Sequence, residues 1–459
     1  MKPTNQIMPP IHTSSSFNNI TKKEDKQENL LRTIGIFGLS TNIINIIVGS
    51  GIFVLPAIVA AGMGAGGIIA YLFCGLLIGL IMLCFAEVGS KITTTGGLYT
   101  YIETAFGKYA GFLSGNLYLM AVLAADAAVS NALVNILAVA FPLFESQIIR
   151  LLFLLIIFLG LAGFNILGIK QGIGLVKLLV VAKILPLLLL VIIGSFKIEI
   201  ASISIETWPE FGQLGTTSLV LFFAFMGGET GLNVSGEVKK PNKNIPRAIF
   251  AGITTVVVLY VFIQLVAQGV LGDELADQNA PLAETAARVF GSQGFMLLTA
   301  GAAVSMFGYL SGSILNMPRV VYALSRDRVI PVKAFSKVHS RFKTPHLAIL
   351  TYAVAGFVIA AFGTFEKLAV IATGGLLLQY LGVALAVIKL RYTRKSRPGE
   401  FKIPGGLIVP LLSVGIIAYF LSKMTYAQAM GTLAATILLT IIYIINRKIS
   451  IENKNTKKL

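Results

Sequence analysis

The sequence has 459 residues, of which 56% are hydrophobic and 12% charged, and its mean hydropathy is +0.83. Soluble domains carry about twice that share of charged residues, so the composition excludes an ordinary soluble protein and indicates a chain that crosses a membrane many times. The formal net charge of +17 is compatible with nucleic-acid binding, but also with a membrane protein whose basic residues lie on one side of the membrane. The distribution of these residues along the chain decides between the two explanations.

The first 31 residues are polar and include a mixed-charge stretch, Lys22-Lys23-Glu24-Asp25-Lys26. They contain no short apolar core with a cleavage site, so we expect 1–31 to be a cytoplasmic tail and not a signal peptide. Twelve apolar stretches follow, each near the roughly 20 residues that a membrane-spanning helix needs. They are 34–59, 65–86, 111–140, 148–167, 172–195, 217–236, 247–271, 293–323, 346–363, 367–390, 406–422 and 427–446.

Lysines and arginines are distributed unevenly between the segments that join these stretches. With the N-terminus in the cytoplasm, 28 of the 37 basic residues fall in inside loops and tails, and only 5 fall in outside loops. Cytoplasmic loops of membrane proteins carry such an excess. The distribution predicts an all-α integral membrane protein with twelve transmembrane helices and both termini cytoplasmic, and it explains the net charge without nucleic acid.

Two of the predicted spans are interrupted by glycine clusters. The first span contains Val48-Gly49-Ser50-Gly51-Ile52-Phe53, and the sixth contains Phe225-Met226-Gly227-Gly228-Glu229-Thr230-Gly231. Where a membrane helix unwinds, its free backbone N–H and C=O groups can bind an ion or the charged ends of a substrate. The alternative is that the small residues only allow helices to pack closely.

The spans divide into two groups of five, in 32–196 and 215–391, followed by two further spans in 404–446 and a cytoplasmic tail, 447–459. An odd number of spans per group inverts the second group relative to the first, as in many secondary transporters. A glycine cluster lies in the first span of each group. This correspondence favours a binding site over packing and predicts that helices 1 and 6 are discontinuous.

Five short motifs lie in or beside the predicted spans. Gly49-Ser50-Gly51-Ile52-Phe53 belongs to the first span, and Ala86-Glu87-Val88-Gly89-Ser90 follows the second. The others lie in 236–247, 325–345 and 397–406. Together they resemble the amino acid–polyamine–organocation (APC) superfamily over nearly the whole chain. The resemblance implies an amino acid permease with a LeuT-like inverted repeat.

The resemblance also implies where an amino acid binds. Its carboxylate is expected at backbone N–H groups near Ser50, and its ammonium at carbonyls near Ile46 and around Phe223 and Met226. A helix start suits an anion and free carbonyls suit a cation. Glycine leaves the backbone accessible to the ligand, so the substrate is also expected to contact the glycines of the two clusters. These are Gly49, Gly51, Gly227 and Gly228.

Three ionisable residues lie deep inside predicted spans: Asp126, Lys183 and Glu229. Such residues indicate a functional site by default. The resemblance places Lys183 against the first helix, either as a proton carrier, which burial of an amine would suit, or as a permanent cation that braces two helices. Both alternatives stay open. Glu229 is a candidate for gating or proton linkage.

Tyr118 and Asp126 lie eight residues apart in the third span, on one helical face. In arginine–agmatine-exchanger-like members of the superfamily, the matching positions line the substrate route, with asparagine at the second. The acid at Asp126 departs from that pattern. It is expected to neutralise a basic substrate side chain, to pair with Lys183 or Glu229, to take up a proton, or to form an internal charge pair without substrate contact.

Two aromatic residues are candidate gates. Phe223 matches a position that closes over substrate in relatives, and Tyr380 in the tenth span is a second candidate of this kind. Arg319, near the inner end of the eighth span, is expected to contact a cytoplasmic gate or lipid headgroups.

These features predict a secondary active amino acid transporter of the cell membrane that works by alternating access. Proton symport and exchange of cationic amino acids or polyamines are alternatives, as is a non-transporting sensor or accessory protein. An enzyme is not expected, because no histidine and no paired cysteine lies at membrane depth. We expect no cofactor and no metal site. The expected partners are an amino acid, a proton or counter-substrate, and the lipid bilayer.

Overall fold

The computed structural model describes residues 32–94, 97–205, 208–327, 329–330, 332–422, 424 and 426–455. These residues are mainly helical and include no β-strand, although Ile34 and Val238 form one isolated parallel bridge. Among them, eight helical segments are long and apolar enough to cross a membrane, and four apolar helices are shorter. The predicted tail 1–31 lies outside the described residues.

Helices cover the predicted apolar stretches, and in the described part of the chain three further α-helices lie between those stretches. Their bounds are α2 (Ile36–Ile47), α3 (Gly51–Met63), α4 (Gly67–Lys91), α5 (Leu98–Phe106), α6 (Lys108–Ala140), α7 (Gln147–Ile166), α8 (Ile169–Gly194), α9 (Ile200–Ile203), α10 (Phe211–Phe222), α11 (Pro241–Leu271), α12 (Pro281–Phe290), α13 (Ser292–Asn316), α14 (Pro318–Arg326), α15 (His346–Phe362), α16 (Phe365–Thr393), α17 (Ile408–Ser422) and α18 (Tyr426–Asn455). Short 3₁₀ helices join several of them: η1 (Gly64–Gly66), η2 (Pro142–Glu145), η3 (Ser195–Lys197), η4 (Phe223–Phe225), η5 (Gly228–Glu237), η6 (Gly272–Asp277) and η7 (Lys333–Ser336).

Two of these helices differ in extent from the prediction. The stretch 293–323 is divided at Met317 into α13 and α14, because Pro318 has no N–H to donate to the preceding turn. The last helix, α18, continues to Asn455, past the start of the tail predicted at 447.

The structure has both discontinuities that the glycine clusters predict. In the first span, α2 ends at Ile47 and α3 begins at Gly51. In the sixth, α10 ends at Phe222 and is followed by η4, which ends at Phe225, and η5 begins at Gly228. The two interrupted spans lie inside the bundle, because α2 packs against α8, α11, α13 and η5, and α10 packs against α3 and α4.

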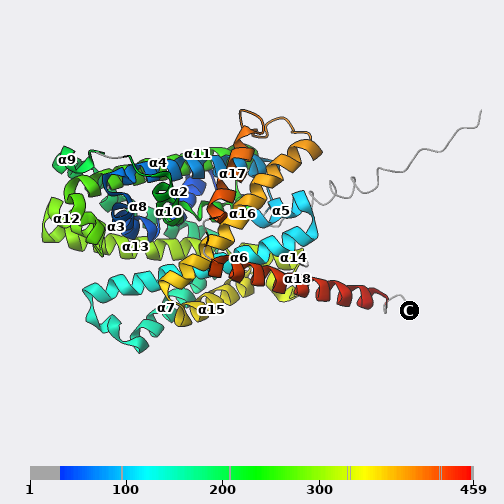
Figure 1. The fold of residues 1–459 in the computed structure, drawn as a ribbon. Coiled ribbons are helices and arrows are strands. Elements are labelled where there is room, and N and C mark those ends of the chain that lie inside the picture. Colours follow the sequence, from blue (N-terminus) through cyan, green and yellow to red (C-terminus); the bar gives the residue numbers. More distant parts are fainter. Residues whose placement is uncertain are drawn as a thin grey trace, which may run out of the picture.

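The two ends of the helical bundle differ in the elements that they carry. Figure 1 shows α9 and α12 at one end and α5 and α14 at the opposite end, where α18 also terminates. The loops after α4, α14 and α16, which the sequence assigns to the cytoplasm, are linked by hydrogen bonds: Tyr99 donates to Asp327, and Arg394 donates to the Lys91 carbonyl.

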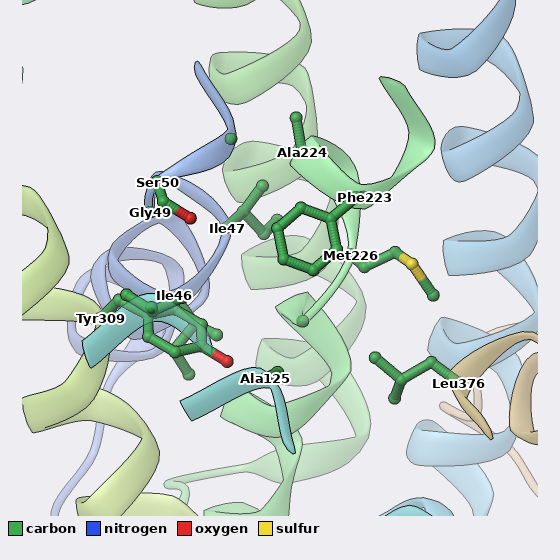
Figure 2. Close-up of a pocket in the computed structure, with 13 residues that line it drawn as sticks. Ile46, Ile47, Gly49, Ser50, Ala125, Phe223, Ala224, Met226, Tyr309 and Leu376 are labelled. Atoms are coloured by element: carbon green, nitrogen blue, oxygen red, sulfur yellow. The ribbon is translucent and has the colours of Figure 1, made fainter. Parts of the chain in front are cut away.

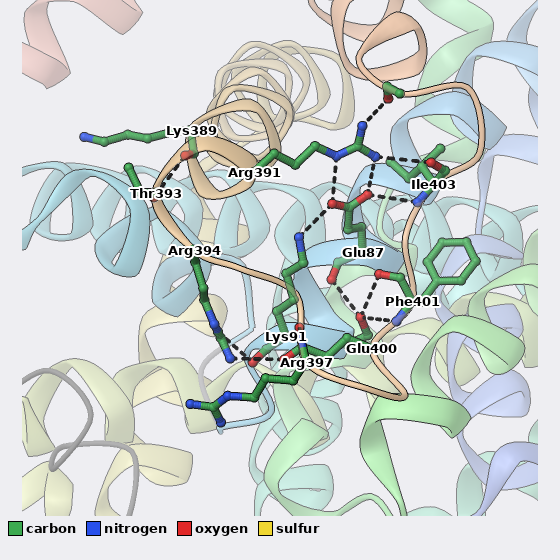
Figure 3. A network of polar contacts seen from close by, with 12 residues as sticks. Glu87, Lys91, Lys389, Arg391, Thr393, Arg394, Arg397, Glu400, Phe401 and Ile403 are labelled. Carbon is green, nitrogen blue, oxygen red and sulfur yellow. Dashed lines mark hydrogen bonds and ion pairs between the residues drawn. The ribbon is translucent and has the colours of Figure 1, made fainter.

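A buried ion-pair network joins the end of α4 to the end of α16 (Figure 3). The Glu87 carboxylate, which is fully buried, accepts bonds from Lys91 at 2.8 Å and from the Arg391 guanidinium at 2.9 and 2.5 Å. It also accepts the backbone N–H of Ile403 at 2.9 Å. One acidic side chain thus fastens the segment after α16 to the end of α4.

Candidate functional site

A cavity lies where the two discontinuous spans meet (Figure 2). Seven of the predicted substrate-binding residues line it: Ile46, Gly49, Ser50, Gly51, Phe223, Met226 and Gly227. Six further lining residues were not predicted: Ile47, Ala125, Val129, Ala224, Tyr309 and Leu376. Apart from Ser50 and Tyr309, the lining side chains are apolar or absent.

Glycine is required where the two breaks touch. A Cβ atom on Gly51 would lie 2.7 Å from the Cα of Ala224, so only glycine lets α3 begin against η4. Gly227 has a φ of +99°, in the region that favours glycine, and a Cβ there would meet the Ile46 side chain at 3.0 Å. The two interruptions are therefore in direct backbone contact.

The start of α3 directs hydrogen-bond donors at the cavity. The first N–H groups of a helix have no partner within the helix, and this end carries partial positive charge. The helix begins at Gly51, and both Gly51 and the preceding Ser50 line the cavity. The Oγ of Ser50 is buried and has no hydrogen-bond partner. This side of the cavity suits a carboxylate.

The end of α2 presents an acceptor on the other side. Protein donors occupy the carbonyls of Asn45, Ile47 and Val48. In the described part of the chain no hydrogen bond reaches the Ile46 carbonyl, and Ile46 lines the cavity. A helix C-terminus carries partial negative charge, so this carbonyl suits an ammonium group.

Lys183 in α8 is fully buried and lies against the first break. Its Nζ donates to the carbonyls of Asn45 and Val48, each at 2.7 Å, and lies 3.5 Å from the Ser305 carbonyl. The three hydrogens of an ammonium match these three acceptors. Lys183 is not among the lining residues of the cavity, so it contacts the unwound backbone and not the space beside it.

Glu229 lies at the second break, at the start of η5, and is fully buried. Its Oε2 accepts the Tyr380 hydroxyl at 2.6 Å and the Gly227 N–H at 3.2 Å, while its Oε1 has no partner. The positive end of η5 offsets a negative charge here. Tyr380, predicted as a gate, contacts Glu229 and does not line the cavity.

Asp126 lies behind the cavity wall, next to the lining residue Ala125. Its Oδ2 accepts the hydroxyls of Ser313 and Tyr352, both at 2.7 Å, and its Oδ1 has no partner. The predicted pairing with Lys183 or Glu229 is wrong, because both of those side chains are bound to the backbone at the breaks.

Three other predicted residues lie in η5 or contact it without lining the cavity. The Tyr118 hydroxyl lies 2.9 Å from the Thr230 hydroxyl and joins α6 to η5. A Cβ on Gly228 would lie 2.8 Å from the Ile47 side chain, so this glycine allows close packing. Arg319 is buried and forms an ion pair with Glu237 at 3.5 Å, so the predicted headgroup contact is wrong.

The main omission of the sequence-based prediction is one face of α13. Ser305 donates to the Val48 carbonyl at 2.8 Å, Tyr309 lines the cavity, and Ser313 donates to Asp126. These residues recur every four positions, which places them on one side of a helix. Polar residues at four-residue spacing inside an apolar span are a sequence signal from which this face of α13 could have been predicted.

Comparison with known proteins identifies the family. The family model described as amino acid permease matches residues 31–446, which is most of the chain. The chain belongs to the amino acid permease family, within the APC superfamily. Its curated relatives are transporters and not enzymes.

Three relatives in Bacillus subtilis illustrate the range of the family. The chain is 30% identical to the serine/threonine exchanger SteT over 84% of its own length and 89% of that protein. It is 28% identical to a methylthioribose transporter and 24% identical to the branched-chain amino acid permease BcaP, over 94% of its own length and 97% of theirs in both cases. The family implies a multi-pass membrane protein with an amino acid as its small-molecule substrate.

Proposed function

We propose that the protein is a secondary active amino acid transporter of the cell membrane that works by alternating access and couples transport to protons. The observation that carries this proposal is the pair of helix breaks around one cavity. N–H groups at the start of α3 and the Ile46 carbonyl at the end of α2 present opposite partial charges to the same space. This polarity complements the carboxylate and ammonium of an amino acid.

The architecture that we propose has twelve membrane-spanning helices, with 32–196 and 215–391 as inverted repeats of five. Two observations support this architecture: helices cover each predicted stretch, and the first span of each group is interrupted. The basic-residue distribution favours cytoplasmic termini. Gating is assigned to Phe223, which lines the cavity, and to Tyr380, which fastens Glu229 behind it.

The lining of the cavity bears on the two subtypes of transport. Beyond Ser50 and Tyr309, the lining side chains are apolar, and neither Asp126 nor Glu229 is among them. This favours uncharged substrate side chains over the cationic amino acids or polyamines of the exchanger alternative. Lys183 is assigned the bracing role, because its ammonium contacts two carbonyls at the first break and the Ser305 carbonyl of α13.

The proposal is tested by uptake into proteoliposomes that contain the purified chain. Radiolabelled leucine, alanine, arginine and putrescine are supplied with and without an inward proton gradient. We expect leucine or alanine to accumulate only with the gradient, and arginine and putrescine to stay at background.

Unlabelled methylthioribose is added as a competitor, since one relative is named a methylthioribose transporter. It lacks an amino acid's carboxylate and ammonium, so we expect no competition. Background uptake of every amino acid would contradict the transporter proposal, and binding without flux would support a sensor.

A further inference from the structure

Three ionisable side chains beside the cavity are fully buried: Asp126, Lys183 and Glu229. No ion pair to any of them occurs among the described residues. Burial of an unpaired charge is costly, so each charge must be offset by other means or be neutralised. The three groups differ in which neighbouring atoms are available to offset their charge.

Two of these charges are offset by the backbone. Lys183 donates to carbonyls at the end of α2, where a helix carries partial negative charge. Glu229 accepts the Gly227 N–H at the start of η5, where a helix carries partial positive charge. Each of these two groups therefore contacts an end of a broken helix whose partial charge is opposite to that of its ionised form.

Asp126 has no such compensation. It lies in the middle of α6, where the backbone N–H groups are used by the helix itself. Around it are hydroxyls: Ser313 and Tyr309 from α13 and Tyr352 from α15. Among the other titratable groups, Tyr118 on its own helix interacts electrostatically with both Asp126 and Glu229, and Tyr380 of α16 interacts with Glu229. No lysine, arginine or histidine of the described residues contacts it.

We propose that Asp126 is the proton-binding group of the transport cycle, which carries one proton with each substrate molecule. This inference rests on the proposed amino acid transport and assigns its coupling. Hydroxyl groups rotate, so Ser313 and Tyr352 can donate to a carboxylate or accept from a carboxylic acid. The unpartnered Oδ1 is the position at which the proton is carried.

Tyr309 connects this carboxyl to the substrate cavity. Its ring lines the cavity and lies against the first break, where a Cβ on Gly49 would be 3.4 Å from the ring. Its hydroxyl faces Asp126. A change in the charge of Asp126 therefore acts electrostatically on a residue that contacts the substrate space.

The proposed step balances in atoms and charge. On the outer side, the Asp126 carboxylate takes one proton from water and forms an O–H bond. On the cytoplasmic side, that bond breaks and the proton returns to water. A zwitterionic amino acid that moves with it is carried with one net positive charge.

The test compares two readouts in proteoliposomes with the full chain. One is accumulation of labelled leucine or alanine, whichever the wild type transports, driven by a pH gradient. The other is counterflow, in which labelled substrate exchanges for unlabelled substrate at equal pH. With one proton per substrate, a gradient of one pH unit supports accumulation of about tenfold.

Asp126→Asn keeps the size and the accepting oxygen of the side chain and removes the titratable group. We expect it to lose gradient-driven accumulation and transport current and to retain counterflow within about threefold. Asp126→Ser is a second neutral variant for the case in which the amide disturbs folding. Asp273→Asn, an exposed acid on η6, is the matched control and should change neither readout.

Four results would overturn the assignment. The first is an Asp126→Asn variant that still accumulates substrate under a pH gradient. The second is a folded Asp126→Asn variant that loses counterflow as completely as accumulation, which would indicate that Asp126 contacts the substrate. A sodium gradient at constant pH could drive accumulation, which would make the group a sodium ligand. If the wild type exchanges amino acids without any pH dependence, this inference fails and amino acid transport stands. If it transports no amino acid, the proposed function fails first.

Discussion

The Nζ of Lys183 lies 2.7 Å from the carbonyl oxygen of Val48, the residue at which the first span stops being helical. Ser305 donates to the same oxygen at 2.8 Å. A residue of α8 and a residue of α13 thus stabilise a backbone group that an intact helix would have satisfied by itself. The broken helix depends on contacts from other helices.

Replacing Lys183 with methionine should disable the site as a whole. Each lost hydrogen bond to a charged group costs about 1.5–3 kcal/mol, which corresponds to roughly a tenfold to hundredfold loss of activity. Counterflow and pH-driven uptake should fall together, because the break itself is disturbed. Lys108→Met, at an exposed lysine at the start of α6, is the control and should keep both activities. Loss of pH-driven uptake with intact counterflow would instead identify Lys183 as the proton carrier.

Gly51→Ala should reduce transport by about tenfold or more. The new methyl group would overlap Ala224, and overpacking of this kind costs about 1–3 kcal/mol. Gly79→Ala in α4 is a matched control, since a Cβ there meets nothing within 4 Å. Uptake and binding are measured for both. Equal activity of the two variants would show that the close approach of α3 to η4 is not needed for transport.

The sequence predicted the parts of this site that depend on backbone geometry. Glycine clusters in the first and sixth spans indicated unwound helices, and both breaks are present. Lys183 could be recognised because a charge deep in an apolar span is conspicuous against its neighbours.

Side-chain partners across helices could not be predicted in the same way. Pairing with another charge was one of the alternatives for Asp126, but its partners are hydroxyls from two distant helices, α13 and α15. Which helix faces which is set by tertiary packing, and single apolar residues such as Ala125 and Leu376 carry no signal in a uniformly apolar span. The lining residues that were missed are mostly of this kind.

Glu87→Gln should destabilise the protein by about 3–5 kcal/mol, because it leaves Lys91 and Arg391 without their buried counter-charge. Thermal unfolding of the detergent-solubilised protein measures this effect. The matched control is Glu274→Gln, since Glu274 pairs with Arg288 on the surface, where both side chains are more than half exposed. That variant should change stability by no more than about 1 kcal/mol. Similar shifts for the two variants would mean that the network in Figure 3 contributes no more than a surface pair.

The size of the cavity should determine which amino acids are transported. Ala125 and Leu376 line the cavity from α6 and α16, outside the two interrupted spans. Ala125→Leu should fill that space and lower the uptake of leucine relative to alanine by about tenfold, since overpacking by a few methylene groups costs about 1–3 kcal/mol. Leu376→Ala should enlarge the space and extend uptake to phenylalanine.

The readout for both variants is a ratio of uptake rates, leucine to alanine or phenylalanine to leucine, so a general loss of folded protein does not affect it. Leu385→Ala, at a residue of α16 that is 40% exposed, controls for a shortened side chain on the same helix and should leave both ratios unchanged. If Ala125→Leu and Leu376→Ala also leave them unchanged, the substrate side chain does not occupy this part of the cavity. The ammonium and carboxylate contacts proposed at the first break would then have to be reversed or displaced.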